Sequence, residues 1–203
     1  MPMLNNCAAV AALALSACST TQSFEVERAS VAPGTAITWL GEPTKLGPAT
    51  SLKVGGTLAP VTLTDLKMKP FQLAPTGKVR LISVLPSLDT PVCDIQTHRL
   101  GEGLDLDPRV ERVTISMDLP YAQRRFSEES GVANVTFLSD YRDGAFGKAT
   151  GLVLERNGLL ARALLVVDGD GIVRHLQVVP EILRLPDLAS ATARANELVK
   201  TSH

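Results

Sequence analysis

The chain has 203 residues, of which 45% are hydrophobic, 20% are charged and 4% are aromatic, and its formal net charge is −1. This near-neutral balance gives no electrostatic basis for binding nucleic acid or an anionic membrane surface, and the scarcity of aromatic residues argues against base stacking. The length is that of one domain with a sizeable buried core.

The N-terminus carries a short apolar run over residues 8–17 that ends in Leu15-Ser16-Ala17-Cys18. A membrane-spanning helix needs about 20 apolar residues, so this run has the length of a signal-peptide core instead. The L-S-A-C sequence resembles the lipobox of bacterial lipoproteins. That resemblance implies a signal peptide over 1–17, lipid attachment at Cys18 and, with Ser19 following, anchoring to the outer membrane facing the periplasm. The alternative is a disordered apolar tail, because Met1 to Asn6 lack the usual positive charge.

The polar residues after Cys18 predict a flexible tether over 18–35, followed by a domain over 36–203. Apolar alternation and continuous apolar runs predict strands at Ile37–Leu40, Pro60–Thr64, Lys78–Leu85, Val110–Met117, Asn134–Leu138, Ala161–Val167 and Ile172–Val179. Helical spacing with Pro and Gly at the ends predicts helices at Cys93–Leu106, Pro120–Gly131, Asp143–Thr150 and Leu188–Val199.

This order of elements predicts a thioredoxin-like α/β fold, with a central mixed sheet flanked by helices and an N-terminal β-hairpin extension. The segment Asp168-Gly169-Asp170-Gly171 indicates a tight turn joining the last two strands.

Cys93 is the only cysteine of the predicted domain, since Cys7 and Cys18 fall in the export segment. A thiol in the first turn of a helix meets free backbone N–H groups and the positive end of the helix dipole, and both favour the thiolate. Cys93 is therefore a candidate nucleophile. An inert, buried small side chain is an equally good interpretation from the spacing alone.

The segment LPSLDTPVC, which ends at Cys93, resembles the P-x-x-x-T-x-x-C motif of peroxiredoxins, and most of all their thiol peroxidase branch. The similarity continues in SMDLPYAQRRF (116–126), in Leu160-Ala161-Arg162-Ala163 and in the Glu181–Asp187 segment. It extends over residues 36 to 200 and implies a thiol-dependent peroxidase with no metal or other cofactor.

By this resemblance Cys93 is the peroxide-attacking cysteine, Thr90 binds the sulfur and the peroxide, Pro86 shields the site, and Arg162 stabilises the thiolate. Independently, an arginine entering the apolar strand ALLVV is costly to bury without an anionic partner. The alternative for Arg162 is a surface cation at a strand end.

The chain departs from the family at Ser127, where the resemblance places a resolving cysteine. Serine cannot capture a sulfenic acid as a disulfide, so an oxidised Cys93 requires an external thiol reductant, either a thioredoxin-like protein or a small thiol. The resemblance also implies a homodimer. A sensor or interaction module that lost turnover is the alternative function, and as an isolated residue Ser127 is an ordinary helix serine.

Other polar residues carry less chemistry. His98, five residues after Cys93, has the chemistry of a base, but a histidine that faces solvent from its helix is the expected interpretation. Asp168 with Asp170 falls short of a calcium-binding loop. With one cysteine and three histidines in the predicted domain, a structural zinc site is not expected. The chain also has no C-x-x-C or C-x-x-x-C motif, which argues against dithiol exchange and copper transfer.

Overall fold

The computed structural model describes residues 24–48, 50–102, 105–132 and 134–201. The predicted signal peptide 1–17 and Cys18 lie outside these residues. Within the described ranges, no helix has both the length and the apolarity needed to cross a membrane.

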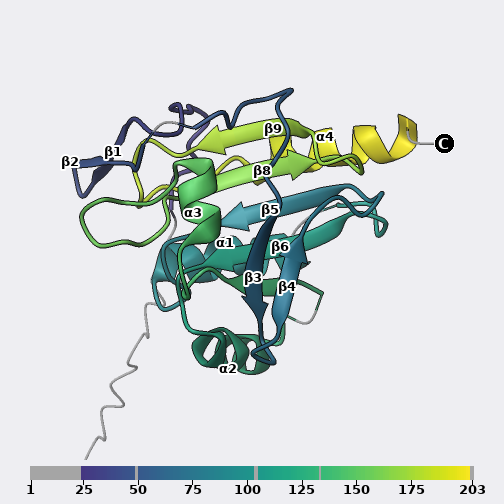
Figure 1. Ribbon diagram of the computed structural model, residues 1–203, viewed down its shortest axis with the longest axis horizontal. Coiled ribbons are helices and arrows are strands. Elements are labelled where there is room, and N and C mark those ends of the chain that lie inside the picture. The colour runs from purple at the N-terminus through teal and green to yellow at the C-terminus, as the bar shows by residue number, and fades with distance from the viewer. Residues whose placement is uncertain (1–23, 49, 103–104, 133, 202–203) are drawn as a thin grey trace, which may run out of the picture.

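A seven-stranded mixed sheet forms the centre of the molecule, in the order β4-β3-β7-β6-β5-β8-β9 (Figure 1). Strands β5, β6 and β7 are parallel, and the other neighbours are antiparallel. Beside it, a two-stranded hairpin of β1 (Ala36–Trp39) and β2 (Glu42–Lys45) confirms the predicted N-terminal extension. The strands of the main sheet are β3 (Val61–Asp65), β4 (Pro70–Leu73), β5 (Arg80–Val84), β6 (Glu111–Ser116), β7 (Thr136–Ser139), β8 (Ala163–Val167) and β9 (Val173–Val178).

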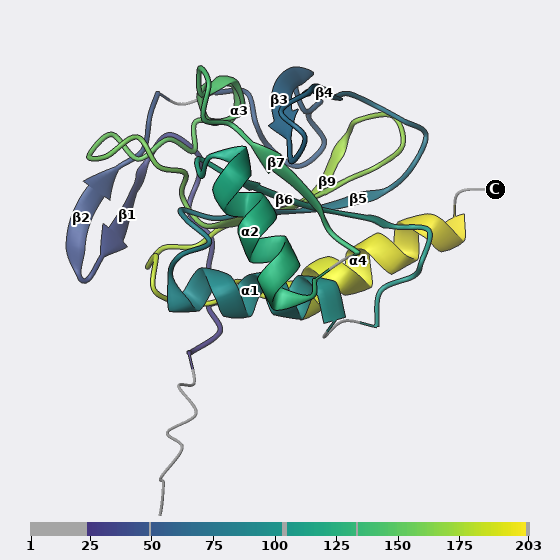
Figure 2. The same ribbon diagram turned by 90° about the horizontal axis from the view of Figure 1, so that it is seen from below.

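In the described part of the chain, four helices cover the two faces of the sheet, as the thioredoxin-like prediction requires. Helices α1 (Pro91–Glu102), α2 (Pro120–Ser130) and α4 (Leu188–Thr201) lie on one face, and the short α3 (Ala145–Thr150) lies on the other (Figure 2). Helix α2 begins with proline and ends at Ser130, and the capping residue Gly131 adopts the left-handed conformation (φ 72°) that glycine reaches without strain.

Two apolar cores result from the side-chain alternation along the central strands. On β8, Leu164 and Val166 pack under α1 and α4, whereas Leu165 and Val167 pack on the α3 side. All four are fully or almost fully buried, and each such side chain contributes about 1.5–3 kcal/mol. The central strands have continuous apolar sequences because helices cover both faces of the sheet.

Gly101 makes the end of α1 uncertain in the sequence, but the helix continues through this residue to Glu102. A Cβ at this position would lie 2.6 Å from Cγ1 of Val132, so only glycine allows the helix to pack this closely. Strands β2 and β4 were not predicted individually, because Pro43 and Pro70 weaken their strand signal; both lie on edges, where proline is tolerated.

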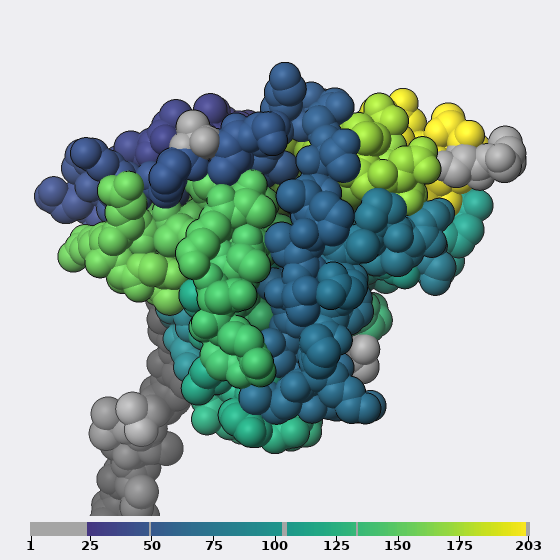
Figure 3. All heavy atoms as spheres, in the orientation of Figure 1, coloured from purple at the N-terminus to yellow at the C-terminus, as the bar shows by residue number. Residues whose placement is uncertain are grey.

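Residues 25–31, inside the segment predicted as a tether, run beside the 177–185 region. Glu27 donates its N–H to the Leu185 carbonyl at 2.7 Å, and Val31 donates to the Val178 carbonyl at 3.0 Å. In the space-filling view, the purple and dark-blue part of the chain also lies beside the green part around residues 150–160 (Figure 3). The ordered contacts of the domain therefore begin ahead of residue 36.

The hairpin is held to the 180–183 segment by the Glu181 carboxylate and by backbone hydrogen bonds, among them that from the Thr38 N–H to the Pro180 carbonyl at 2.6 Å. Glu181 accepts hydrogen bonds from the Thr38 hydroxyl at 2.6 Å and from the Gly41 N–H at 3.2 Å. The Ile182 N–H donates in turn to the Thr38 carbonyl at 3.0 Å. The hairpin thus supports the segment that supplies the Ile182 carbonyl.

Candidate active site

The sheet topology brings Cys93 and Arg162 together at one edge. Cys93 lies in the first turn of α1, which follows the carboxyl end of β5. Strand β8 runs antiparallel to β5, and its first residue, Ala163, pairs with Val84 at the end of β5. Arg162, immediately before β8, therefore reaches the helix that begins after β5.

The central contact of this site is a hydrogen bond from Nη2 of Arg162 to Sγ of Cys93, at 3.2 Å. Arg162 is 1% exposed, so the alternative of a surface cation does not describe it. Cys93 has no exposed surface, as the alternative of a buried small side chain also expects, and its sulfur has the arginine as a partner. Burial lowers the pKa of Arg162, and the charge and hydrogen bond of Cys93 oppose that effect. The guanidinium is thus a fixed cation directed at the sulfur.

Two further acceptors hold the Arg162 guanidinium in place. Its Nε donates to the Ile182 carbonyl at 2.9 Å, and its Nη1 donates to Oε1 of Gln96. Gln96 lies one turn after Cys93 on α1 and is fully buried. The sequence provided no sign of this residue's role, because its partner is 66 positions away.

The loop between β5 and α1 carries the other two predicted residues. Within this loop Pro86 is buried, and Thr90, the residue before α1, is exposed. The Thr90 carbonyl accepts the Asp94 N–H at 2.9 Å, which begins the helix, while its hydroxyl donates to the Ser87 carbonyl at 3.1 Å. The structure therefore places Thr90 at the site but directs its hydroxyl to the loop.

Asp118 fixes this loop from the end of β6. Its carboxylate accepts from the Ser87 hydroxyl at 2.7 Å, the Leu88 N–H at 2.8 Å and the Ser116 hydroxyl at 2.8 Å. Asp118 belongs to the SMDLP segment used for the family resemblance, yet its role depends on a loop 30 residues earlier. Only the parallel pairing of β5 and β6 makes the two meet.

Ser127 lies on α2, which is next to α1. The Phe126 ring contacts the His98 ring edge-on, with centroids 6.2 Å apart. The Ser127 hydroxyl donates to the Val132 carbonyl at 3.4 Å, near the end of its own helix. Cys93 is free, and among the described residues no disulfide is formed.

The remaining polar candidates have structural partners. His98 lies 3.6 Å from the Asp94 carboxylate on the same helix. Asp168 accepts the Ile172 N–H at 2.9 Å and the Arg174 guanidinium at 2.6 Å, which closes the predicted β8–β9 turn. In the part of the chain that the structure describes, His, Cys, Asp and Glu do not gather into a group of three that could hold a metal.

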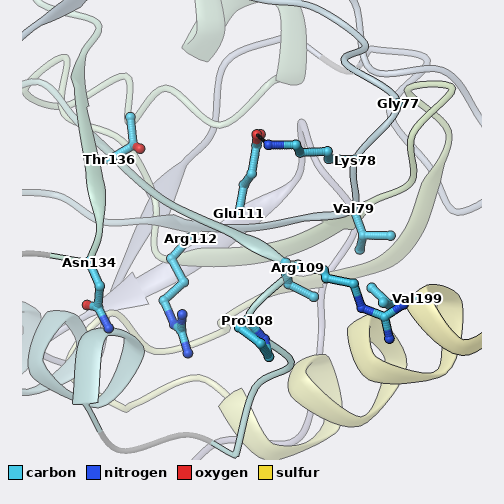
Figure 4. A pocket seen from close by; sticks show the side chains of 11 residues that line it. Gly77, Lys78, Val79, Pro108, Arg109, Glu111, Arg112, Asn134, Thr136 and Val199 are labelled. Carbon is cyan, nitrogen blue, oxygen red and sulfur yellow. Dashed lines mark ion pairs between the residues drawn. The ribbon is translucent and has the colours of Figure 1, made fainter.

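A cavity of about 690 Å³ opens at the opposite end of the sheet (Figure 4). Lys78 pairs there with Glu111 at 3.4 Å, and Arg109 pairs with Asp107 at 2.9 Å. The cavity shares no lining residue with the Cys93 site, which lies beyond the other end of β5. Its lining consists of Gly77, Lys78, Val79, Pro108, Arg109, Val110, Glu111, Arg112, Asn134, Thr136 and Val199.

Comparison with protein families matches residues 53–193 to the Redoxin family. A thiol peroxidase of Halalkalibacterium halodurans is 42% identical over 164 residues, covering 80% of this chain and 93% of the relative. A thiol peroxidase of Clostridium acetobutylicum is 41% identical over 138 residues, covering 68% and 84% of the two chains.

Solved structures agree on the fold. A peroxiredoxin-like protein from Aquifex aeolicus has a TM-score of 0.77 and 31% identity, covering 83% of this chain and 99% of its own. A thiol peroxidase from Chromobacterium violaceum has a TM-score of 0.70 at 19% identity, over 81% and 97% of the two chains, and supports the fold alone.

Proposed function

Since the chain belongs to the Redoxin family and is a peroxiredoxin enzyme, we propose that it reduces hydrogen peroxide and alkyl hydroperoxides through Cys93 with an external thiol. The observation that supports this most is the 3.2 Å contact between the buried Arg162 guanidinium and the Cys93 sulfur. The guanidinium is a charged donor held beside the atom that would attack the peroxide, and such a preorganised donor stabilises negative charge that develops there.

The proposed reaction proceeds in two stages. The Cys93 thiolate attacks the terminal oxygen of the peroxide, so that an S–O bond forms, the O–O bond breaks, and alkoxide or hydroxide leaves and takes up a proton. Cys93 becomes a sulfenic acid. One external thiol then displaces water to give a mixed disulfide, and a second thiol releases the Cys93 thiolate and a disulfide.

The other residues of the Cys93 site have separate proposed roles in this reaction. Arg162 stays beside the sulfur while negative charge moves onto the leaving oxygen, which is where a preorganised donor has its largest effect. Thr90 turns its hydroxyl from the Ser87 carbonyl toward the peroxide, and Pro86 limits the access of bulk water. Because the Cys93 side chain is fully covered, a peroxide enters by displacing the exposed turn at Asp89–Pro91.

We propose a cycle that uses a single cysteine. The position that the family resemblance assigns to a resolving cysteine is Ser127, and the printed sequence has no cysteine after Cys93. The reductant is a thioredoxin-like protein or a small thiol. A homodimer is part of the same proposal and rests on the family resemblance.

The cellular setting is a proposal from the sequence alone. The L-S-A-C segment supports export and lipid attachment at Cys18, with the domain on the periplasmic side of the outer membrane. Mass spectrometry of the mature N-terminus tests this directly. We expect a diacylated or triacylated Cys18, and an unmodified chain beginning at Met1 would contradict the proposal.

The activity is tested on the full chain with Cys7 and Cys18 replaced by serine, so that Cys93 is its only thiol. Peroxide consumption is followed with glutathione, dithiothreitol or reduced thioredoxin, and Cys93→Ser serves as the control. We expect Cys93 to be oxidised far faster than free cysteine and to turn over with at least one donor. Oxidation no faster than that of free cysteine would overturn the proposal.

A second variant tests how the sulfenic acid is resolved. In Ser127→Cys we expect a peroxide-induced disulfide with Cys93, detected by mass and by loss of free thiols, and a reduced need for a monothiol donor. Fast oxidation of the unmodified Cys93 site without recycling by any donor would support the sensor function instead.

A further inference from the structure

The far cavity, at the opposite end of β5 from Cys93, has the dimensions of a ligand site. Its volume of about 690 Å³ lies within the roughly 300–1,000 Å³ that is typical of pockets for small molecules. The segments just before β5 and β6 line it, together with Thr136 at the start of β7 and Val199 of α4. Because β5, β6 and β7 are parallel, their starting ends meet at one edge of the sheet.

The charged groups of the far cavity are not evenly balanced. Among the described residues, its lining contains three cations, Lys78, Arg109 and Arg112, and one carboxylate, Glu111. Lys78 lies 3.4 Å from the Glu111 carboxylate, and Arg109 lies 2.9 Å from Asp107, which is outside the lining. Two of the three cations therefore already have an anionic partner within the protein, and Arg112 is the third.

Arg112 is a half-buried cation whose hydrogen-bonding groups are incompletely satisfied. Its Nη2 donates to the Leu106 carbonyl at a long 3.5 Å, and its buried Nε has no hydrogen-bond partner among the described residues. A guanidinium carries five N–H donors, and a donor that is shielded from water without a partner costs free energy. An acceptor inside the cavity would supply the partner that the described protein groups do not.

The surrounding residues leave this guanidinium available to a ligand. Glu111 precedes it on β6, but successive side chains of a strand point to opposite faces. Figure 4 accordingly shows the Arg112 side chain directed away from the Lys78–Glu111 pair. The Asn134 amide donates to the Gly101 carbonyl at 2.6 Å and is thus already used.

We propose that the far cavity binds a small organic anion, and that Arg112 pairs with the carboxylate or phosphate group of this ligand. A planar guanidinium suits both groups because it donates two parallel hydrogen bonds to two oxygens. Pro108 and Val199 add apolar surface against which the carbon body of the ligand can pack. The inference does not depend on the proposed function, since the cavity shares no lining residue with the Cys93 site.

Binding is tested on the full chain with Cys7 and Cys18 replaced by serine, by amide proton–nitrogen correlation spectra at constant ionic strength. The probes are butyl phosphate and butyrate, and butanol is the neutral control with the same four-carbon body. We expect saturable shifts at residues 109–112 and 134–136 with at least one anion and not with butanol. A response to one anion alone assigns the ligand class to phosphate esters or to carboxylates. No saturable shift with either anion, or equal shifts with butanol, would overturn the proposal.

A pair of variants tests whether Arg112 supplies the charge. In Arg112→Gln we expect the affinity for the anion to fall by about tenfold or more, because charge-assisted hydrogen bonds are lost. The matched control is Arg142→Gln. Arg142 is exposed, follows the other end of β7, and donates to the Tyr141 hydroxyl at 3.5 Å without an ion pair to a described carboxylate. We expect its affinity to match that of the parent.

Equal affinities in Arg112→Gln and the parent would overturn the proposal. Arg112 would then only complement the partial negative charge of the carbonyl groups at the ends of α1 and α4. If Arg112→Gln does not fold, the parent spectra still decide, because the largest shifts at residues 86–93 instead of the far cavity would contradict the site. A parent that binds the anion at the far cavity but oxidises slowly at Cys93 would remove the proposed function and leave this inference in place.

Discussion

Two buried arginines occupy opposite ends of the same pair of strands, β5 and β8, and they are neutralised differently. Arg80 begins β5, is 6% exposed, and donates to the Glu111 carboxylate at 2.8 Å and to the Ala74 carbonyl at 2.6 Å. Arg162 precedes β8, is 1% exposed and has no carboxylate among its described partners.

The two arginines therefore have different electrostatic surroundings: Arg80 is paired with a carboxylate, and Arg162 is directed at a sulfur. The charge of Arg80 is already balanced by a neighbouring strand, so its effect is confined to folding. The burial of Arg162 is compensated by hydrogen bonds to two neutral acceptors, Ile182 and Gln96, and to the Cys93 sulfur. Burial alone is therefore shared by the two arginines, and they differ in that Arg162 has no carboxylate among its described partners.

The largest expected effect comes from removing the unbalanced cation. Arg162→Met keeps the length of the side chain but removes a donor aimed at the reacting sulfur, and loss of one such donor slows chemistry by about 10²–10³-fold. We expect the second-order oxidation of Cys93 by peroxide to fall by that amount. Stopped-flow measurement of this oxidation rate tests the prediction, with Arg80→Met as the matched control. Equal decreases of the rate in the two variants would contradict the proposed difference between the two arginines.

A smaller effect, on stability, is expected from removing the charge of the carboxylate that pairs with Arg80. Glu111→Gln leaves Arg80 buried with only neutral acceptors, and we expect the free energy of unfolding to fall by about 1–3 kcal/mol. The lower part of that range applies, because the Glu111 side chain is 32% exposed. Urea unfolding measures it, while the oxidation rate of Cys93 stays unchanged.

Lys78→Met provides the control for that comparison. Lys78 pairs with the same carboxylate at 3.4 Å from a 64% exposed position, so its removal changes stability by less than about 0.5 kcal/mol. A loss in Lys78→Met as large as that in Glu111→Gln would contradict the structural role of Arg80.

The smallest effect is expected at the exposed pair beside the far cavity. Hydrogen bonds from Arg109 hold the pKa of Asp107 at about 2, below the ordinary value of 3.8. Because the folded pKa is depressed, the stabilisation from this carboxylate is complete above pH 3.8 and is lost as the pH falls toward 2. We expect Asp107→Asn to flatten acid unfolding in that window, measured by circular dichroism, without changing the Cys93 oxidation rate.

The sequence predicted the elements whose signals are local. The apolar run of β5, the proline that begins α2 and the turn at 168–171 each coincide with the structure, since a few neighbouring residues determine them. The edge strands β2 and β4 were missed because each contains a proline and few apolar residues. Their pairing partners, rather than their own propensities, place them in sheets.

The candidate site was predictable only as far as the family resemblance extended. Cys93 and Arg162 lie in motifs, and the structure joins them. Gln96 has no such signal, since a polar residue three positions after a helical cysteine is ordinarily a surface group. Its burial depends on Ser83 and Arg162, which are 13 and 66 positions away in the chain.

The hairpin and the Cys93 site both depend on contacts between residues that are far apart in the sequence, and this affects when each contact can form during synthesis. Thr38 and its partner Glu181 are 143 positions apart, and Cys93 precedes Arg162 by 69. At about 5–20 residues per second, a ribosome adds those 69 residues over several seconds. Throughout that interval the cysteine exists without its cation, so the hydrogen bond from Arg162 to the sulfur can form only after residue 162 has been added.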